Sequence, residues 1–272
     1  MIMTDDKFKK EFLKVMDKFS GRYSKWQIWT DFLYLSAAAI ANVVPVAERE
    51  EREKRYLEII NRYDKEHQEL FPQLFGLVVM ALEDNPEQDF LGELYHQLHL
   101  EQHQKGQFFT PYHVCHLMAE IQLVDRDIEN EKKNKDFISV HDPACGAGAL
   151  LIAFANVAKK HGINYCQDVL FVAQDIDMTA ALMCYLQLSL LGCPAVIIVG
   201  DSLAKPGFHP DNQVWYSPIF YLYHWKFRDF INGTETKKEV VTINDEVSVE
   251  STILKYMENE EGQLILPTLK AS

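Results

Sequence analysis

A glycine-containing heptapeptide, Asp-Pro-Ala-Cys-Gly-Ala-Gly at residues 142–148, lies between the apolar run Phe137–His141 and a helical pattern that begins at Ala149. Glycines at such a junction let a backbone turn approach a ligand closely. The first turn of the following helix offers N–H groups that have no intrahelical partner. A nucleotide-like ligand needs this arrangement, and a tight strand-to-helix turn without a ligand is the alternative interpretation.

The pattern after Pro111 alternates between strand and helix. Such alternation predicts parallel strands joined by crossover helices, with a ligand site at the carboxyl ends of the strands. The expected fold class is therefore α/β, with a doubly wound, Rossmann-like sheet. The predicted strands are Phe137–His141, Asp168–Ala173 and Ala195–Val199, and the predicted helices between them are Ala149–Lys160 and Met178–Leu191.

The chain before this alternation has a helical pattern. Apolar residues recur there at three- and four-residue spacing, and strand signals are scarce. Trp26–Ala41 is expected to form a largely buried helix, and Glu48–Tyr63 an exposed helix with charges of both signs. We therefore predict a helical region over 1–92, an α/β domain over 93–230, and a hairpin and tail over 231–272, where Asn232-Gly233 and Asn244-Asp245 are turn signals.

Composition limits the classes of function. With 272 residues and 47% hydrophobic content, the chain is long enough for one catalytic-size domain and a smaller helical part. The formal net charge of −13 disfavours unaided binding to a polyanion such as DNA. Five cysteines without Cys-x-x-Cys pairing fit a reducing cytoplasm, and the longest apolar stretch, Phe32–Ala47, is too short to cross a membrane.

Three further motifs accompany the heptapeptide in a fixed order. Gly-Gln-Phe-Phe-Thr-Pro at 106–111 precedes it, and Gln-Asp-Ile-Asp at 174–177 and Gly-Asp-Ser-Leu at 200–203 follow it. This series resembles the S-adenosylmethionine domain of N6-adenine DNA methyltransferases, above all the modification subunits of type I restriction systems. The resemblance covers 92–203 well, and it implies that the cofactor is S-adenosylmethionine.

The motifs give each residue of the expected cofactor site a role. Asp142 at a strand end suits the ammonium group of the cofactor, while Gly146 and Gly148, with Ala144, form the turn. Asp175 suits the two ribose hydroxyls, and Ile176 can pack on the adenine. Asp201 is expected to accept a hydrogen bond from the exocyclic amine of the adenine, and Ser202 and Leu203 are expected to shape the pocket. The resemblance places three further residues over the methionine end of the cofactor: Gln107, Phe109 and Thr110.

The expected catalytic segment departs from the family pattern. The family holds the target amine with Asn/Asp/Ser-Pro-Pro-Tyr/Phe, whose aromatic ring stacks on the extruded base. At the corresponding place this chain has Ser217-Pro218-Ile219-Phe220, so Ile219 replaces the second proline. Ser217, Pro218 and Phe220 are the candidate catalytic residues. The polar Asn212-Gln213 before them leaves a nonfunctional loop as the alternative.

Two functions follow from these patterns. The first is an adenine-N6 DNA methyltransferase that contacts DNA through a partner specificity subunit, because no recognition domain fits after the motif. The second is an S-adenosylmethionine-binding regulatory or sensor subunit without methylation chemistry, with a homodimer as one assembly. His96, His99 and His103 are expected to form a polar helix face, and no metal site is predicted.

Overall fold

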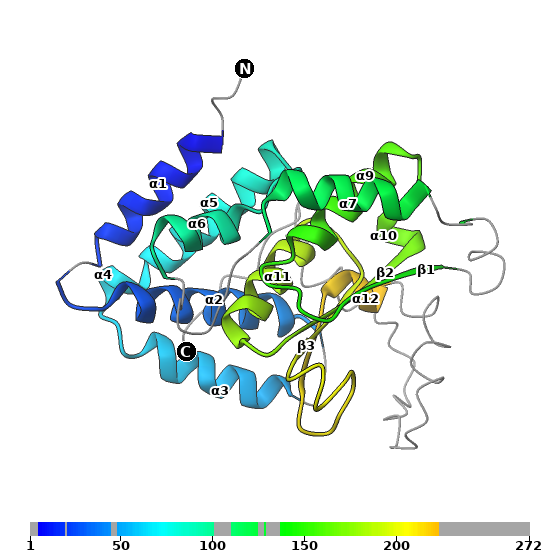
Figure 1. Ribbon diagram of the computed structural model, residues 1–272. Helices are drawn as coiled ribbons and strands as arrows, with labels where there is room; N and C mark the ends of the chain where they lie inside the picture. Colours follow the sequence, from blue (N-terminus) through cyan, green and yellow to red (C-terminus); the bar gives the residue numbers. More distant parts are fainter. Residues whose placement is uncertain are drawn as a thin grey trace, which may run out of the picture.

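The computed structural model describes residues 5–19, 21–44, 48–100, 110–124, 128 and 137–222 (Figure 1). Helices dominate its first half, as the sequence predicts, and a four-stranded sheet with flanking helices makes up the second half. The helices of the first half are α1 (Asp5–Asp17), α2 (Lys25–Ala41), α3 (Arg49–Ile60), α4 (Lys65–Gln68), α5 (Leu70–Asp84), α6 (Phe90–Gln97) and α7 (Tyr112–Val124). The expected hairpin and tail over 231–272 lie outside the described residues.

Helix α2 is the central helix of the first half. It begins after Ser24, whose hydroxyl accepts a hydrogen bond from the Gln27 backbone N–H at 3.1 Å, an ordinary N-cap. Its side chains are buried on nearly all sides, which confirms the expectation of a largely buried helix.

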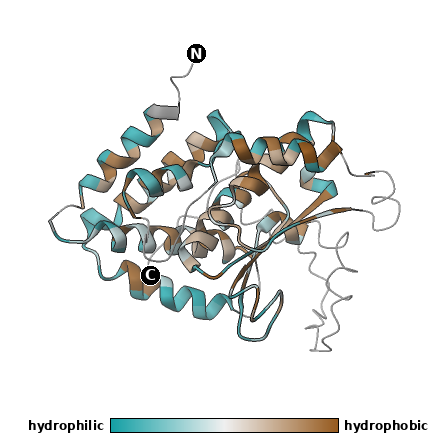
Figure 2. Cartoon of the chain, viewed as in Figure 1, coloured by the Kyte–Doolittle hydropathy of each residue, from teal (hydrophilic) through white to brown (hydrophobic). Residues whose placement is uncertain are grey.

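Helix α3 is mostly hydrophilic and exposed, also as expected (Figure 2). Its Arg52 is an exception, because it is buried with its guanidinium 4.4 Å from the ring centre of Trp215.

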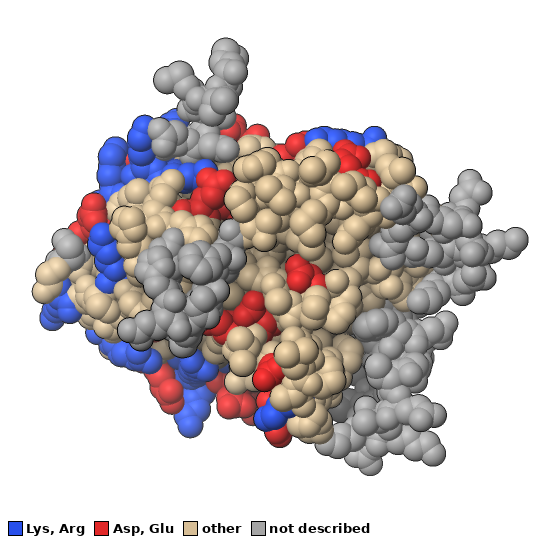
Figure 3. Space-filling model, viewed as in Figure 1, with Lys and Arg blue, Asp and Glu red and all other residues tan. Residues whose placement is uncertain are grey.

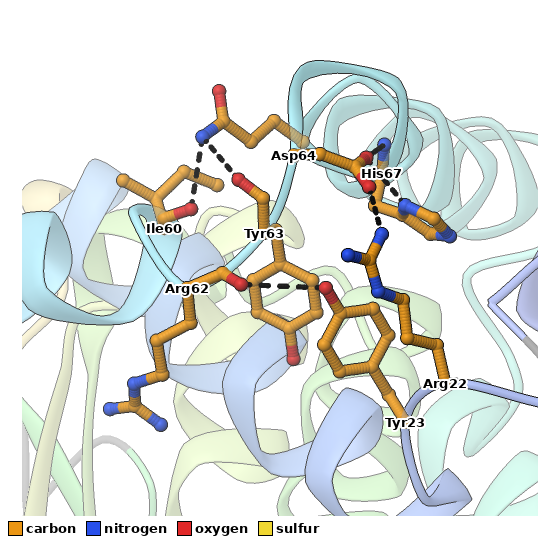
Figure 4. A network of polar contacts seen from close by, with 8 residues as sticks. Arg22, Tyr23, Ile60, Arg62, Tyr63, Asp64 and His67 are labelled. Carbon is orange, nitrogen blue, oxygen red and sulfur yellow. Dashed lines mark hydrogen bonds and ion pairs between the residues drawn. The ribbon is translucent and has the colours of Figure 1, made fainter.

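A polar network joins the turn between α3 and α4 to the segment before α2 (Figure 4). Asp64 caps α4 by accepting from the His67 backbone N–H at 3.1 Å, and it forms an ion pair with Arg22. The Tyr23 hydroxyl donates to the Arg62 carbonyl at 3.4 Å. These bonds fix the start of α2 to the turn that leads from α3 into α4.

The second half contains a mixed sheet in the order β1-β2-β3-β4. Strands β1 (Ile138–Asp142), β2 (Val169–Asp175) and β3 (Ala195–Val199) are parallel, as predicted, and α9 (Ala149–Lys160) and α11 (Met178–Leu190) connect them. The short helix α10 (Tyr165–Asp168) leads into β2. Strand β4 (Gln213–Tyr216) pairs antiparallel with β3, which the sequence did not predict because polar residues begin it.

The two faces of the sheet have different cores. On one face, Phe171 and Ile197 share a continuous apolar cluster with α9, α11 and the N-terminal helices. On the other face, Leu170 and Ile198 belong to a smaller cluster that contains Phe220 of α12 (Pro218–Leu222). The helical region therefore packs on the same face as both crossover helices. None of the described helices combines the length and hydropathy needed to span a bilayer.

Candidate cofactor site

Three predicted aspartates meet at one edge of the sheet. Asp142 is the last residue of β1, Asp175 is the last residue of β2, and Asp201 follows β3 by two residues. The parallel register pairs Asp142 with Ala173 and Asp175 with Val199, so the strands end side by side. The structure thus brings these carboxylates together at the carboxyl ends of the strands, where parallel α/β sheets bind ligands.

The glycine bend has a geometry that requires glycine. Gly146 and Gly148 have φ angles of +56° and +94°, in the region that side chains of L-residues rarely adopt. A Cβ atom on Gly148 would lie 2.8 Å from Cys184 Sγ and 3.3 Å from Cys184 Cα. Gly148 therefore lets the start of α9 pack directly against α11.

Asp175 organises the backbone around the bend. Its Oδ2 accepts from the Gly146 N–H and its Oδ1 accepts from the Asp177 N–H, both at 2.9 Å. Each carboxylate oxygen has a second lone pair and can accept from a ligand hydroxyl as well. Burial raises the pKa of Asp175, while the two backbone bonds oppose that shift. The side chain is thus fixed in position and is poorly solvated.

Asp142 has a similar environment. Its Oδ1 accepts from the Ala144 N–H at 3.1 Å, and burial raises its pKa above the ordinary value of 3.8. Among the described residues, no lysine or arginine forms an ion pair with Asp142 or Asp175. Two partly buried carboxylates that lack a described lysine or arginine partner favour a ligand that carries positive charge.

The loop after β3 is held by two side-chain amides. Gln174 is buried, donates to the Lys205 carbonyl at 2.9 Å and accepts from the Gly207 N–H at 2.9 Å. The Asn212 amide donates to the Lys205 carbonyl at 2.8 Å and to the Gly207 carbonyl at 2.7 Å. The loop that carries Asp201 and Ser202 is therefore fixed at Lys205 and Gly207.

Asp201 directs one oxygen into this loop. Its Oδ1 accepts from the Leu203 and Ala204 N–H groups at 2.9 and 3.1 Å, and these bonds lower its pKa. Two predicted apolar residues of the site are solvent-exposed: 71% of Ile176 and 94% of Leu203 is accessible. Exposed aliphatic groups beside carboxylates suit a ligand with an apolar ring and polar substituents.

A buried amide supports the bend from behind, and the sequence analysis missed it. Gln187 of α11 is fully buried and donates to the Ala147 carbonyl at 2.9 Å and to Asp89 Oδ1 at 2.8 Å. Its own Oε1 accepts from the Leu91 N–H at 3.1 Å. The sequence signal is a single amide inside an otherwise apolar helix. Because Asp89 caps α6, this network ties the helical region to the glycine bend.

The first turn of α7 lies near the same edge. Burial, and then the nearby Asp89 and Asp142 carboxylates, raise the pKa of Cys115 to about 11. The Cys115 thiol donates to the carbonyl of Thr110, which is itself exposed. Thr110 is therefore linked to Asp142 through Cys115, whereas the predicted site residues Gln107 and Phe109 lie outside the described residues.

The predicted catalytic residues lie at a different edge of the sheet from the three aspartates. Ser217 is fully buried, and its hydroxyl donates to the Cys193 carbonyl at 2.7 Å and accepts from the Ala195 N–H at 2.8 Å. These partners are at the start of β3, about 13 Å of extended chain from its carboxyl end. Phe220 is buried in the smaller core, and Pro218 begins α12. The segment therefore joins β4 to the sheet at the edge opposite the aspartates.

Other predicted clusters add no chemistry to the described site. No group of three His, Cys, Asp or Glu side chains that could hold a metal occurs in the part of the chain that the structure describes. His96 closes α6, and His103 lies outside the described residues. Cys145 is buried, and its pKa is raised by its contact with Cys184 and by burial. Its thiol is thus a packing group at the bend.

Comparison with known proteins gives one family match and several structural matches. The family model described as N-6 DNA methylase matches residues 86–255. No curated protein sequence matches significantly. A class I S-adenosylmethionine-dependent methyltransferase from Listeria monocytogenes is 14% identical, with a TM-score of 0.38, over 93% of this chain and 79% of that chain. The methyltransferase subunit of a type I restriction-modification system from Streptococcus thermophilus is 16% identical, with a TM-score of 0.36, over 71% of this chain and 57% of that chain.

Proposed function

Because this chain belongs to the N-6 DNA methylase family, we propose that it binds S-adenosylmethionine at the carboxyl edge of β1, β2 and β3. The observation that carries this proposal is the pair of partly buried carboxylates, Asp142 and Asp175, beside a bend that requires glycine at 148. S-adenosylmethionine carries both an ammonium and a sulfonium charge, so it supplies the positive charge that this edge lacks. When bound, it supplies an electrophilic methyl group.

Each group of the cofactor has a proposed partner. Asp142 binds the ammonium group, Asp175 accepts from the ribose hydroxyls with its remaining lone pairs, and Ile176 packs on the adenine. The exocyclic amine donates to Asp201, whose Oδ2 is not used in the two loop bonds. Ser202 and Leu203 complete the adenine side. Gln107, Phe109 and Thr110 cover the methionine end by family resemblance.

The role that the geometry favours is a cofactor-binding regulatory or sensor subunit. The support is the position of Ser217 and Phe220, whose polar and aromatic groups stabilise the amino-terminal edge of β3 and the smaller core. Groups in that position cannot hold a base against a methyl group at the opposite edge, because transfer requires near contact of the reacting atoms. In this role the chain responds to the concentration of S-adenosylmethionine.

Family membership favours a second candidate, an adenine-N6 DNA methyltransferase that works with a specificity subunit. A partner is part of this proposal because the net charge of −13 opposes unaided binding to DNA. The visible lysines and arginines gather mainly over the N-terminal helices, away from the sheet (Figure 3). The partner would then supply most of the contacts to the phosphates.

Calorimetric titration of the full chain with S-adenosylmethionine tests the shared part of both candidates. We expect saturable binding, and we expect Asp175→Asn to weaken it at least tenfold because the ribose loses an ionised acceptor. The matched control is Asp168→Asn, which changes a carboxylate at the other end of β2. Equal affinity of both variants and the original protein would refute the ribose assignment.

Transfer of a labelled methyl group to mixed-sequence DNA separates the two roles. The regulatory role predicts background transfer even when binding is saturated and candidate specificity subunits are present. The enzymatic role predicts transfer above background with such a subunit. Transfer that is abolished by Phe220→Ala, with cofactor affinity and stability unchanged, would contradict the structural role of that ring.

A further inference from the structure

Helix α7 is apolar on two opposite sides. One side, with Cys115, Ala119 and Leu123, is buried and faces α9. The opposite side carries five apolar residues that remain accessible to solvent. They are Val114, Leu117, Met118, Ile121 and Val124, with exposed fractions of 36%, 60%, 41%, 56% and 73%. We call these five residues the outer face of α7.

An amphipathic helix normally turns its apolar stripe toward a core, and α7 has a second apolar stripe besides the buried one, separated from it by His113, His116 and Glu120 on one flank and Gln122 on the other. The members of the outer face form two overlapping rows with intervals of three or four residues, Val114–Leu117–Ile121–Val124 and Val114–Met118–Ile121, so they make one continuous strip along the helix. Figure 3 shows an expanse of uncharged side chains over α7 on this face of the molecule. A contiguous apolar strip of this kind indicates a surface that another segment covers.

We propose that a carboxyl-terminal segment of the same chain, within residues 223–255, packs against the outer face of α7. This proposal does not depend on cofactor binding. The family model continues to residue 255, which is 33 residues beyond the last described residue, Leu222. The family domain therefore includes chain that follows α12.

The sequence distinguishes this segment from the other two stretches next to α7. The stretch 125–136, which leads from α7 to β1, has nine charged residues among its twelve, so it has few apolar side chains to offer. The stretch 101–109 has two phenylalanines at its end and is otherwise polar or charged, apart from Gly106. Neither composition matches five exposed apolar side chains on a helix.

Residues 223–255 have the composition that is needed. Aromatic and aliphatic residues recur from Tyr223 to Ile231, and Val241, Ile243, Val247 and Val249 alternate with other residues on either side of the Asn244-Asp245 turn signal. Alternation of this kind predicts strands with one apolar face. Ten extended residues span roughly 33 Å, about the diameter of a small domain, so the segment can reach α7 from α12.

Photocrosslinking in the full chain tests the proposal. A benzophenone amino acid replaces Leu117 in one variant and Ile121 in another, and crosslinked peptides are identified by mass spectrometry. The matched control is the same amino acid at Leu57, an aliphatic residue of α3 that is 48% exposed. We expect the α7 probes to crosslink within one molecule to peptides from 223–255, and the Leu57 probe to give none of these products.

Four results would overturn the proposal. Crosslinks between α7 probes of two molecules would assign the outer face to a homodimer, and crosslinks confined to 101–109 or 125–136 would assign it to a neighbouring stretch. A yield no higher than that of the Leu57 probe would mean that water covers the face. Crosslinks that form only with an added specificity subunit would assign it to that partner.

A second measurement uses substitutions in the same full chain. Leu117→Asp should lower the urea midpoint of unfolding more than Leu57→Asp, because the first places a charge in a packed surface and the second leaves it in water. Hydrogen exchange in peptides from 223–255 should become faster in Leu117→Asp and stay unchanged in Leu57→Asp. Equal midpoints together with unchanged exchange would contradict the proposed packing.

Discussion

Gly148→Ala is the substitution whose effect the structure defines most closely. The new methyl group would sit on a residue with φ of +94° and would approach Cys184 Sγ to 2.8 Å and Cys184 Cα to 3.3 Å. The left-handed backbone costs an L-residue about 1–2 kcal/mol. Overpacking against a fixed helix costs about 1–3 kcal/mol more. We therefore expect the free energy of unfolding to fall by about 2–5 kcal/mol.

Gly162→Ala is the matched control for this change. Gly162 follows the other end of α9 with φ of +78°, and no atom lies within 4 Å of its hypothetical Cβ. In this variant only the cost of the left-handed backbone applies, so the free energy of unfolding should fall by about 1–2 kcal/mol. Urea unfolding at equilibrium measures both losses. Calorimetry should show weaker S-adenosylmethionine binding for Gly148→Ala and unchanged affinity for Gly162→Ala.

Combining Gly148→Ala with Cys184→Ala identifies the contact. Removal of Sγ relieves the shortest approach but leaves Cα at 3.3 Å, so the second substitution should recover part of the loss. The double-mutant cycle should give a coupling of about 0.5–3 kcal/mol, the range for residues in contact. Equal losses for Gly148→Ala and Gly162→Ala, with no coupling to Cys184, would refute the packing explanation.

Three further predictions concern buried polar groups. Asp89→Asn should keep the acceptor for Gln187 and remove a carboxyl whose pKa is raised by burial, so the free energy of unfolding at neutral pH should stay equal or increase. Asp89→Ala removes the acceptor, so it should lower the free energy of unfolding in urea by about 1–3 kcal/mol. Lower stability of Asp89→Asn at neutral pH would mean that the charge itself is needed. Ser217→Ala should also cost about 1–3 kcal/mol but leave the affinity for S-adenosylmethionine unchanged; lost affinity at unchanged stability would move Ser217 to the site. Acidification should weaken cofactor binding, beginning above the ordinary carboxyl value of 3.8, because Asp142 and Asp175 have raised pKa values and act in their ionised forms, Asp142 on the ammonium group and Asp175 on the ribose hydroxyls. Calorimetry between pH 8 and the acid limit of folding checks this, and a flat profile would contradict it.

Acidification should affect the folding stability of the free protein in the opposite direction from cofactor binding. A raised pKa means that the folded chain holds the proton more tightly than the unfolded chain does. Between the ordinary carboxyl value and the raised one, the stability contributed by Asp89 and Asp175 therefore increases as the pH falls. At higher pH their ionised forms oppose folding. The same holds for Asp142, whose pKa burial also raises, and there the bound ammonium group of the cofactor offsets the effect.

Local patterns predicted most of the α/β half. Apolar runs of five or six residues predicted β1, β2 and β3, and the glycine turn predicted where α9 begins. The same patterns predicted that Asp142, Asp175 and Asp201 share an edge, because parallel strands all end on the same side of a sheet. The helical region followed from its three- and four-residue spacing, and α2 and α3 have the predicted buried and exposed characters.

Gln187 and Asp89 could not be assigned in this way. They are 98 residues apart and meet because α11 packs against the start of α6. A single amide in an apolar helix indicates a buried polar partner, but local sequence carries no information about which of many distant groups it is. The outer face of α7 is a related case, since its spacing indicates packing without naming the segment that packs there.

By itself, the sequence determined the order of strands and helices and the residues at their ends, because periodicity and turn chemistry act over a few neighbouring residues. The tertiary structure alone decided where Ser217 lies. Strand β4 runs antiparallel to β3, and an antiparallel strand ends at the opposite edge of the sheet from its neighbour. If β4 ran parallel to β3, the segment 217–220 would follow it at the edge where the aspartates lie. The direction of a strand depends on the strand with which it pairs, and local sequence does not specify that partner.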